Sequence, residues 1–93
     1  MNLQLNYLYR DASNYKNYGW VIVSTYNVDL NEIDRKIREK LIDGEYFSAA
    51  KVGFPELFFN IPNEDDHDWH EYQSVEETQE LAFLRLEDFL NRL

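Results

Sequence analysis

The residues best suited to chemistry lie in one segment, Asn63–Glu71, which reads NEDDHDWHE. The segment contains both histidines of the chain, set among several acids. Imidazole and carboxylate groups are common ligands of zinc, manganese and non-haem iron. A metal site is therefore one hypothesis for this segment, with His67, Asp68 and His70 as its candidate ligands.

The metal hypothesis depends on where the side chains of this segment point. In an extended chain, successive side chains leave opposite faces, so Asp68 and His70 share one face and Trp69 and Glu71 share the other. If Trp69 fills the core, as aromatic residues commonly do, Asp68 and His70 lie together on the outside. The spacing differs from the H-E-x-x-H motif, and there is no third histidine. Metal binding is therefore the lesser hypothesis.

Catalysis without a metal would need a nucleophile beside a base, or paired acids in a pocket. The sequence has no G-x-S-x-G turn and no cysteine, and its three glycines are scattered. Neither a nucleophile elbow nor a phosphate-binding loop can be built from these residues. We predict that the protein is not an enzyme and needs no cofactor.

A binding role for the segment is the main hypothesis. Its acids, with the aromatic neighbours Trp69 and Tyr72, suit a basic partner surface, because charge speeds association and aromatic side chains supply affinity. The polar interval Asp11–Tyr18 holds two more tyrosines, which either reach a partner or fold back over the sheet. The predicted partner-binding residues are Glu64, Asp65, Asp66, Asp68, Glu71, Tyr15 and Tyr18.

A purely structural interpretation competes with these hypotheses. In it, the acids face water, one histidine satisfies a loop backbone, and Trp69 plugs the core beside the first helix. This interpretation assigns no ligand or partner to the segment.

The distribution of charge narrows the choice of partner. The net charge is −9, and residues 1–43 hold six acids and six bases, so residues 44–93 carry all of the excess. Such a field repels nucleic acid and anionic lipid, and we expect a basic protein surface as the partner. An alternative is a nucleic-acid mimic that blocks a nuclease or DNA-binding protein. Its candidate acids are those listed above together with Glu76, Glu77 and Glu80.

Length and composition predict one folded domain over residues 1–93, with 44% hydrophobic residues. The lack of cysteine excludes disulfides. No apolar run approaches the ~18 residues that a membrane span requires. We expect a cytoplasmic protein that is a monomer or a homodimer.

The first half of the chain predicts the scaffold most clearly. Residues 3–9 alternate apolar and polar types except at Leu8, which predicts a strand with one buried face. Residues 19–25, GWVIVST, place apolar residues on both faces of an extended chain, which predicts a central strand. A helix is predicted from the cap Asp29 to the stop at residues 43–44. Its apolar stripe consists of Leu30, Ile33, Ile37 and Leu41.

The second half of the chain predicts three or four further elements. A short helical turn is expected over residues 48–52, followed by a hairpin of two strands within residues 57–73. Apolar residues at helical spacing over 82–93 predict a last helix, capped by Ser74 or Thr78. The order ββαββα predicts an α+β fold with a mainly antiparallel four-stranded sheet and two helices packed on one face.

Three segments resemble parts of a group of small bacterial proteins of unknown function. They are YLYRDASNYKNYG (residues 7–19), LIDGEYF (residues 41–47) and DHDWHEY (residues 66–72). The resemblance implies a small cytoplasmic bacterial or phage-borne protein. It brings no activity, ligand or catalytic residue.

Overall fold

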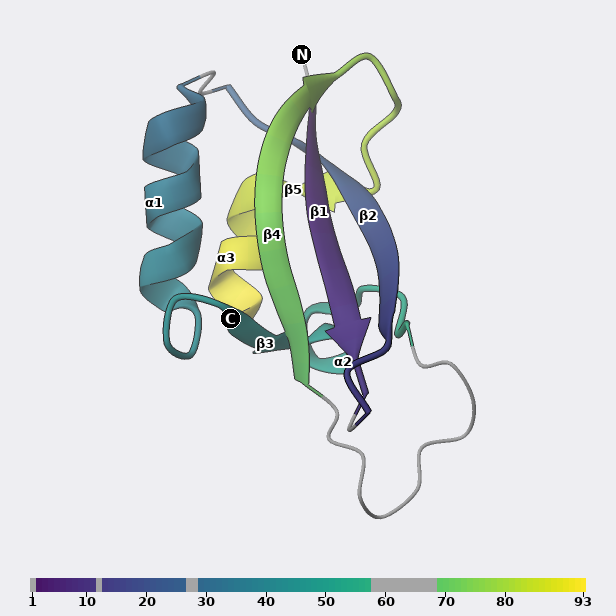
Figure 1. The fold of residues 1–93 in the computed structure, drawn as a ribbon. Coiled ribbons are helices and arrows are strands. Elements are labelled where there is room, and N and C mark those ends of the chain that lie inside the picture. Colours follow the sequence, from purple (N-terminus) through teal and green to yellow (C-terminus); the bar gives the residue numbers. More distant parts are fainter. Residues whose placement is uncertain (1, 12, 27–28, 58–68) are drawn as a thin grey trace.

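The computed structural model describes residues 2–11, 13–26, 29–57 and 69–93. Within these residues the fold belongs to the α+β class, as predicted (Figure 1). The elements in chain order are β1 (Asn2–Arg10), β2 (Lys16–Ser24), α1 (Leu30–Lys40), β3 (Tyr46–Ser48), α2 (Ala49–Val52), β4 (Trp69–Thr78), β5 (Leu84–Arg85) and α3 (Leu86–Arg92).

The described strands form one sheet in the order β3-β4-β1-β2-β5. Strand β1 is antiparallel to β2 and to β4, β3 is antiparallel to β4, and β5 is parallel to β2. The helices lie on one side of this sheet (Figure 1). The prediction of four antiparallel strands and two helices is thus correct in class, while the sheet is mixed and has one more strand.

The central strand β1 shows the predicted alternation. Leu3, Leu5, Tyr7 and Tyr9 are at most 2% exposed. All of these except Tyr9 belong to the core cluster, in which they are joined by residues from the helices. These partners are Ile33 and Ile37 of α1, Ala49 and Val52 of α2, and Leu86 and Phe89 of α3.

Both helices predicted in the first two thirds of the chain begin as expected. The Asp29 side chain accepts hydrogen bonds from the backbone N–H groups of Asn31 and Glu32, which would otherwise lack partners at the start of α1. The Ser48 hydroxyl caps α2 in the same way by accepting from Lys51 N, and Gly53 ends that helix at φ 78°. A left-handed residue here favours glycine.

The hairpin predicted within residues 57–73 is wrong. Strand β4 is longer than expected and is flanked by β1 and by β3, so Tyr46–Ser48 takes the place predicted for the preceding hairpin strand. Leu57 is not in a strand, and residues 58–59, the rest of the predicted strand, lie outside the described residues. The non-local pairing of β4 with β1 decides this arrangement, and sequence period alone does not reveal it.

The last helix is shorter than predicted. Ser74 and Thr78 lie within β4 and cap no helix, and α3 begins only at Leu86. Ala82 and Phe83 are exposed and precede the helix. Among the helices of the described ranges, none is long and apolar enough to cross a membrane.

Strand β4 contains an irregularity opposite β1. Asn6 pairs with Ser74 but the next residue, Tyr7, pairs with Tyr72, so Gln73 has no opposite residue on β1. Two residues of β4 thus span one step of β1, which is the geometry of a β-bulge. The bulge places Tyr72 on the helix side, where it is 3% exposed and joins the core together with Val75.

Arg38 of α1 holds the bulge in place. Its Nη2 donates to the carbonyl oxygen of Gln73 at 2.9 Å, and its Nη1 donates to that of Gly44 at 3.1 Å. The guanidinium carbon also lies 4.9 Å from the centre of the Tyr72 ring. Asp34 orients both partners, because it pairs with Arg38 at 3.1 Å and accepts from the Tyr72 hydroxyl at 2.7 Å.

Replacing Arg38 with alanine is expected to lower the free energy of unfolding by about 1–2 kcal/mol, because two backbone carbonyls lose a charged donor. Urea denaturation measures this change. The control is Arg35→Ala in the same helix, whose exposed ion pair with Glu39 contributes at most about 0.5 kcal/mol. Equal losses in the two variants would show that Arg38 does not hold the bulge.

Alkaline pH is expected to destabilise the protein through Tyr7. Burial raises the pKa of Tyr7 to about 12, against ~10 for an unfolded tyrosine. Folding therefore favours the neutral phenol, and this contribution is complete below pH ~10 and is lost as the pH rises towards 12. Tyr7→Phe should flatten the fall in unfolding free energy over that range.

Urea denaturation of wild type and Tyr7→Phe at a series of pH values from 9 to ~12 tests this prediction. The slope is compared, since the variant also loses the 2.5 Å hydrogen bond from the Tyr7 hydroxyl to the carbonyl of Pro55. Tyr15→Phe is the control, because Tyr15 is 70% exposed. An unchanged slope in Tyr7→Phe would disprove the assignment.

Candidate functional site

The histidine-acid segment enters the described structure only at its end. Asn63–Asp68 lie outside the described residues, and with them Glu64, Asp65, Asp66, His67 and Asp68. Trp69, His70 and Glu71 begin β4. Their side chains alternate as predicted, but the faces are reversed: His70 is fully buried and Trp69 is 41% exposed. The expectation that Trp69 plugs the core is wrong.

The His70 imidazole lies within the aromatic part of the core. Its ring centre is 5.2 Å from that of Tyr9, 5.9 Å from that of Tyr7 and 6.3 Å from that of Phe47. Nε2 accepts a hydrogen bond from the backbone N–H of Leu57 at 3.0 Å. Because an accepting nitrogen carries no proton, the neutral ring holds its proton on Nδ1.

These contacts give His70 a structural role. They agree with the structural interpretation, in which one histidine satisfies a loop backbone. Its ring faces the core, whereas a site shared with Asp68 required it on the outer side. Among the residues described, no group of three or more His, Asp or Glu side chains is placed to hold a metal ion.

Glu71 occupies the opposite side of β4 and is also buried, at 7% exposure. Its carboxylate accepts two hydrogen bonds from Arg10. Arg10 Nε donates to Oε2 at 3.0 Å, and Arg10 Nη2 donates to Oε1 at 3.3 Å. Such a two-point pair fixes the guanidinium plane. Glu71 therefore orients Arg10, and its charge is already matched within the chain.

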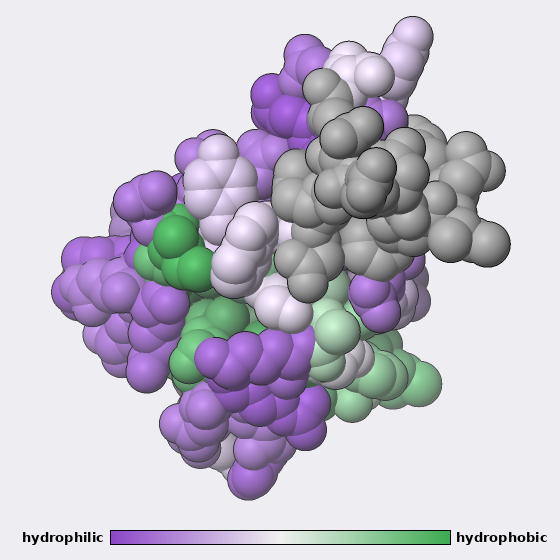
Figure 2. Space-filling view, turned by 90° about the horizontal axis from the view of Figure 1, so that it is seen from below, coloured by the Kyte–Doolittle hydropathy of each residue, from purple (hydrophilic) through white to green (hydrophobic). Residues whose placement is uncertain are grey.

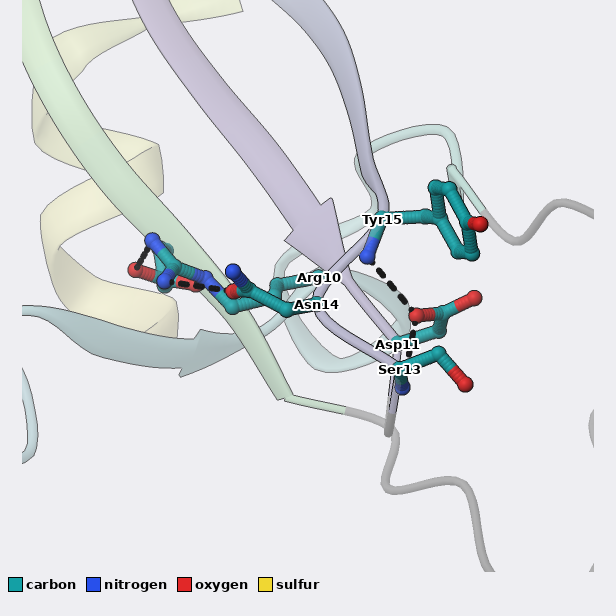
Figure 3. A network of polar contacts seen from close by, with 6 residues as sticks. Arg10, Asp11, Ser13, Asn14 and Tyr15 are labelled. Atoms are coloured by element: carbon teal, nitrogen blue, oxygen red, sulfur yellow. Dashed lines mark hydrogen bonds and ion pairs between the residues drawn. The ribbon is translucent and has the colours of Figure 1, made fainter.

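Arg10 in turn holds the turn between β1 and β2 (Figure 3). Its Nη1 donates to the Asn14 side chain at 2.9 Å, and Asn14 adopts a left-handed φ of 66°. Asp11 Oδ1 accepts from the backbone N–H groups of Ser13 and Tyr15, both at 2.9 Å. Five residues are thereby locked in one conformation, with Tyr15 projecting from the turn (Figure 3).

Both predicted contact tyrosines are displayed to solvent. Tyr15 is 70% exposed and Tyr18 is 58% exposed. The alternative, in which the tyrosines fold back over the sheet, is therefore not adopted. The polar interval is also shorter than predicted, because β2 begins at Lys16.

Trp20 is a surface aromatic that the sequence analysis missed. It is 61% exposed, although the run GWVIVST predicted a strand buried on both faces. Val21, Ile22 and Val23 do fulfil that expectation, with at most 8% exposure. The only sequence signal for the exposure of Trp20 is its spacing. It lies two and four residues after Tyr18 and Lys16, so the three side chains share one face of the strand.

We call the side of the sheet opposite the helices the outer face. The register assigns three rows to it across β2, β1 and β4. Two aromatic residues and an isoleucine lie on β2, a leucine and two amides on β1, and two acids and a hydroxyl on β4. The rows are Tyr18–Leu8–Glu71, Trp20–Asn6–Ser74 and Ile22–Gln4–Glu76.

The middle of the outer face is a connected polar strip. Gln4 donates to the Asn6 side-chain oxygen at 2.8 Å, and Asn6 donates to Ser74 Oγ at 3.1 Å. At the β2 edge, Trp20, Ile22 and Phe83 help to line an apolar depression of about 230 Å³. Phe83 is 65% exposed and its backbone N–H bonds the carbonyl of Ile22 at 2.7 Å.

Exposed acids follow on β4 and in the loop after it. Glu76, Glu77 and Glu80 are exposed and, within the described ranges, form no ion pair. By contrast, five acids are matched by bases elsewhere. Those matched acids are Glu32, Asp34, Glu39, Glu71 and Asp88.

No protein-family model matches the chain, and comparison with curated proteins and with solved structures gave no match. The resemblance to small bacterial proteins therefore stays a prediction.

The reversed faces of β4 lead to a stability prediction. His70→Ala should lower the free energy of unfolding by about 2–4 kcal/mol, because it opens a cavity among the rings and leaves the Leu57 N–H unbonded. Trp69→Ala removes a larger but partly exposed side chain and should cost less. Urea denaturation compares the two, and a larger loss in Trp69→Ala would contradict the assignment of faces.

Proposed function

We propose that this protein is a non-enzymatic protein-interaction module that docks its outer face on a basic partner surface. One observation carries the proposal: Tyr18 and Trp20 are exposed on β2, while Glu76, an exposed acid with no ion pair within the described ranges, lies on the same outer face of β4. Aromatic anchors beside unmatched charge are the features that protein interfaces use.

The aromatic residues supply the affinity in this proposal. Tyr15, Tyr18 and Trp20 each expose more than half of their surface. Tyr and Trp are enriched at interface centres because each buries a large area at a small loss of rotamer freedom. Leu81, at 91% exposure, and Phe83 extend the apolar contact at the end of the sheet that carries the acids.

The acids supply the choice of partner. Three of the uncompensated charges in a chain of net charge −9 lie here: Glu76 on the outer face, Glu77 on the helix side of β4 and Glu80 in the following loop. A field of this sign attracts basic surfaces and raises their rate of association. Glu64, Asp65, Asp66 and Asp68 remain sequence-based members of the docking surface, since they lie outside the described ranges. We exclude Glu71 from it because Arg10 already pairs with it.

The locked turn supports binding by a preformed surface. Because Asp11 and Arg10 already fix the turn, Tyr15 loses little freedom when a partner arrives. Preorganisation of this kind strengthens binding by lowering the entropy lost on association.

The nucleic-acid mimic is less well supported than a protein-docking surface with aromatic anchors. A mimic needs its acids in a row that follows a phosphate backbone, whereas Glu76 and Glu77 are neighbours on one strand and leave opposite faces. We place the partner in the cytoplasm and assign neither nucleic acid nor a membrane to the docking surface. The module acts as a monomer or a homodimer.

Pulldown from a lysate of the source cell, followed by elution with increasing salt, tests the proposal. The screening length falls from ~10 Å at 0.1 M to ~3 Å at 1 M salt, so captured proteins should elute as salt rises. Both Trp20→Ser and the double variant Glu76→Gln/Glu80→Gln should reduce capture about tenfold or more, as expected for hot-spot residues.

The control removes two negative charges elsewhere, by Asp43→Asn and Glu45→Gln, both at exposed positions. It should capture the same proteins as wild type. Capture that is indifferent to salt, or lost equally in the control, would disprove docking through the outer face.

A further inference from the structure

A second candidate site lies away from the outer face, at the end of the molecule formed by β3 and α2. A cavity of about 210 Å³ opens there, with apolar walls from Ile42, Phe47, Val52 and Trp69. Figure 2 looks onto this end and shows apolar surface bordered by hydrophilic residues. This cavity shares no lining residue with the depression beside Trp20 and Phe83.

The charge of the cavity is opposite to that of the chain. Two of its lining residues, Lys40 and Lys51, are cationic, and no Asp or Glu side chain is among the described residues that line it. Neither lysine belongs to an ion pair within the described ranges. A chain of net charge −9 therefore keeps two unmatched cations beside an apolar cavity.

Helix-end electrostatics offers a simpler reason for these lysines. Each lies in the last turn of a helix, α1 or α2, where a cation is favoured by the partial negative charge of the free carbonyls. That effect explains a lysine at each helix end. It does not explain why both lysines border an apolar cavity, and a ligand test separates the two explanations.

We propose that this cavity binds a small apolar monocarboxylate. The apolar part of the ligand packs against Ile42, Phe47, Val52 and Trp69, and its carboxylate pairs with Lys40 and Lys51. Small-ligand sites have this composition, with mostly apolar walls and a few polar groups that fix orientation. The volume equals that of about seven water molecules at ~30 Å³ each, which suits a six-carbon aliphatic acid or a single-ring aromatic acid.

This proposal is independent of the proposed function. It concerns other residues, and its test uses purified protein with small molecules and no partner. Failure of either proposal therefore leaves the other standing.

Fluorescence titration of the full chain with hexanoate tests the site. Because Trp20 is the other tryptophan, Trp20→Phe leaves Trp69 as the only indole reporter, in the cavity wall. Hexanoate should change the emission with a dissociation constant of about 1 mM or below. The neutral probe 1-hexanol and the cation hexylammonium should bind about tenfold more weakly or worse.

Amide NMR of the wild-type chain gives a second readout that needs no variant. Hexanoate should shift the signals of Trp69, Lys51 and Ile42, and leave those of Tyr18 unchanged. This measurement also excludes a fluorescence change that arises from nonspecific contact.

Charge-removing variants complete the test. Lys40→Gln/Lys51→Gln should weaken hexanoate binding about tenfold and leave 1-hexanol binding unchanged. The matched control Lys16→Gln/Lys36→Gln removes two cations outside the cavity and should bind as wild type. Circular dichroism verifies that both variants fold.

Three outcomes would overturn the proposal. They are equal binding of hexanoate, 1-hexanol and hexylammonium, unchanged hexanoate affinity in Lys40→Gln/Lys51→Gln, and shifts that spread over the whole chain at ~10 mM hexanoate, well above the expected dissociation constant.

Discussion

The bulge at Gln73 is the constraint on which the two faces of the sheet depend. Tyr72 lies in the core and Val75 packs against it from the same side, yet a regular strand sends residues three apart to opposite faces. The extra residue resolves this conflict. Every side chain of β4 before it points to the face opposite the one it would take in a regular strand. His70 then enters the core, while Trp69 and Glu71 go to the other side. Arg38 stabilises the arrangement by binding the carbonyl of the bulged residue.

The effect of the bulge reaches the proposed docking surface through a short series of polar contacts. Glu71 lies opposite Leu8 on the outer face, where its carboxylate fixes Arg10. Arg10 fixes the left-handed Asn14, and the turn presents Tyr15 (Figure 3). Polar groups in such a series are satisfied together, so each one restricts the next. Glu71, which the sequence suggested as a contact residue, is instead buried and positions Arg10.

Elements with local signals were predictable from the sequence, and elements defined by distant pairing were not. The caps Asp29 and Ser48, the alternation of β1 and the exposed Tyr15 and Tyr18 each agree with or fall within the predicted pattern. Ser74 resembles a helix cap but lies in β4, because pairing with Asn6 overrides a local motif. Trp20 was assigned to the interior because hydrophobicity cannot distinguish a covered from an uncovered side of a strand. The faces of Trp69 and His70 were reversed because the expectation relied on the general burial of aromatic residues, and alternation alone does not show which side of a strand the helices cover.

The pairing of β1 with β4 also bears on how the chain folds during synthesis. Asn2 lies opposite Thr78, so β1 gains its second neighbour in the sheet only after β4, much later in the chain, has been synthesised. Until then β1 and β2 form a two-stranded hairpin, which is marginally stable in water, with one edge of β1 unpaired. Closing so long a loop is slow compared with local helix formation. The nascent chain thus exposes an apolar strand edge, a type of surface that chaperones shield from aggregation.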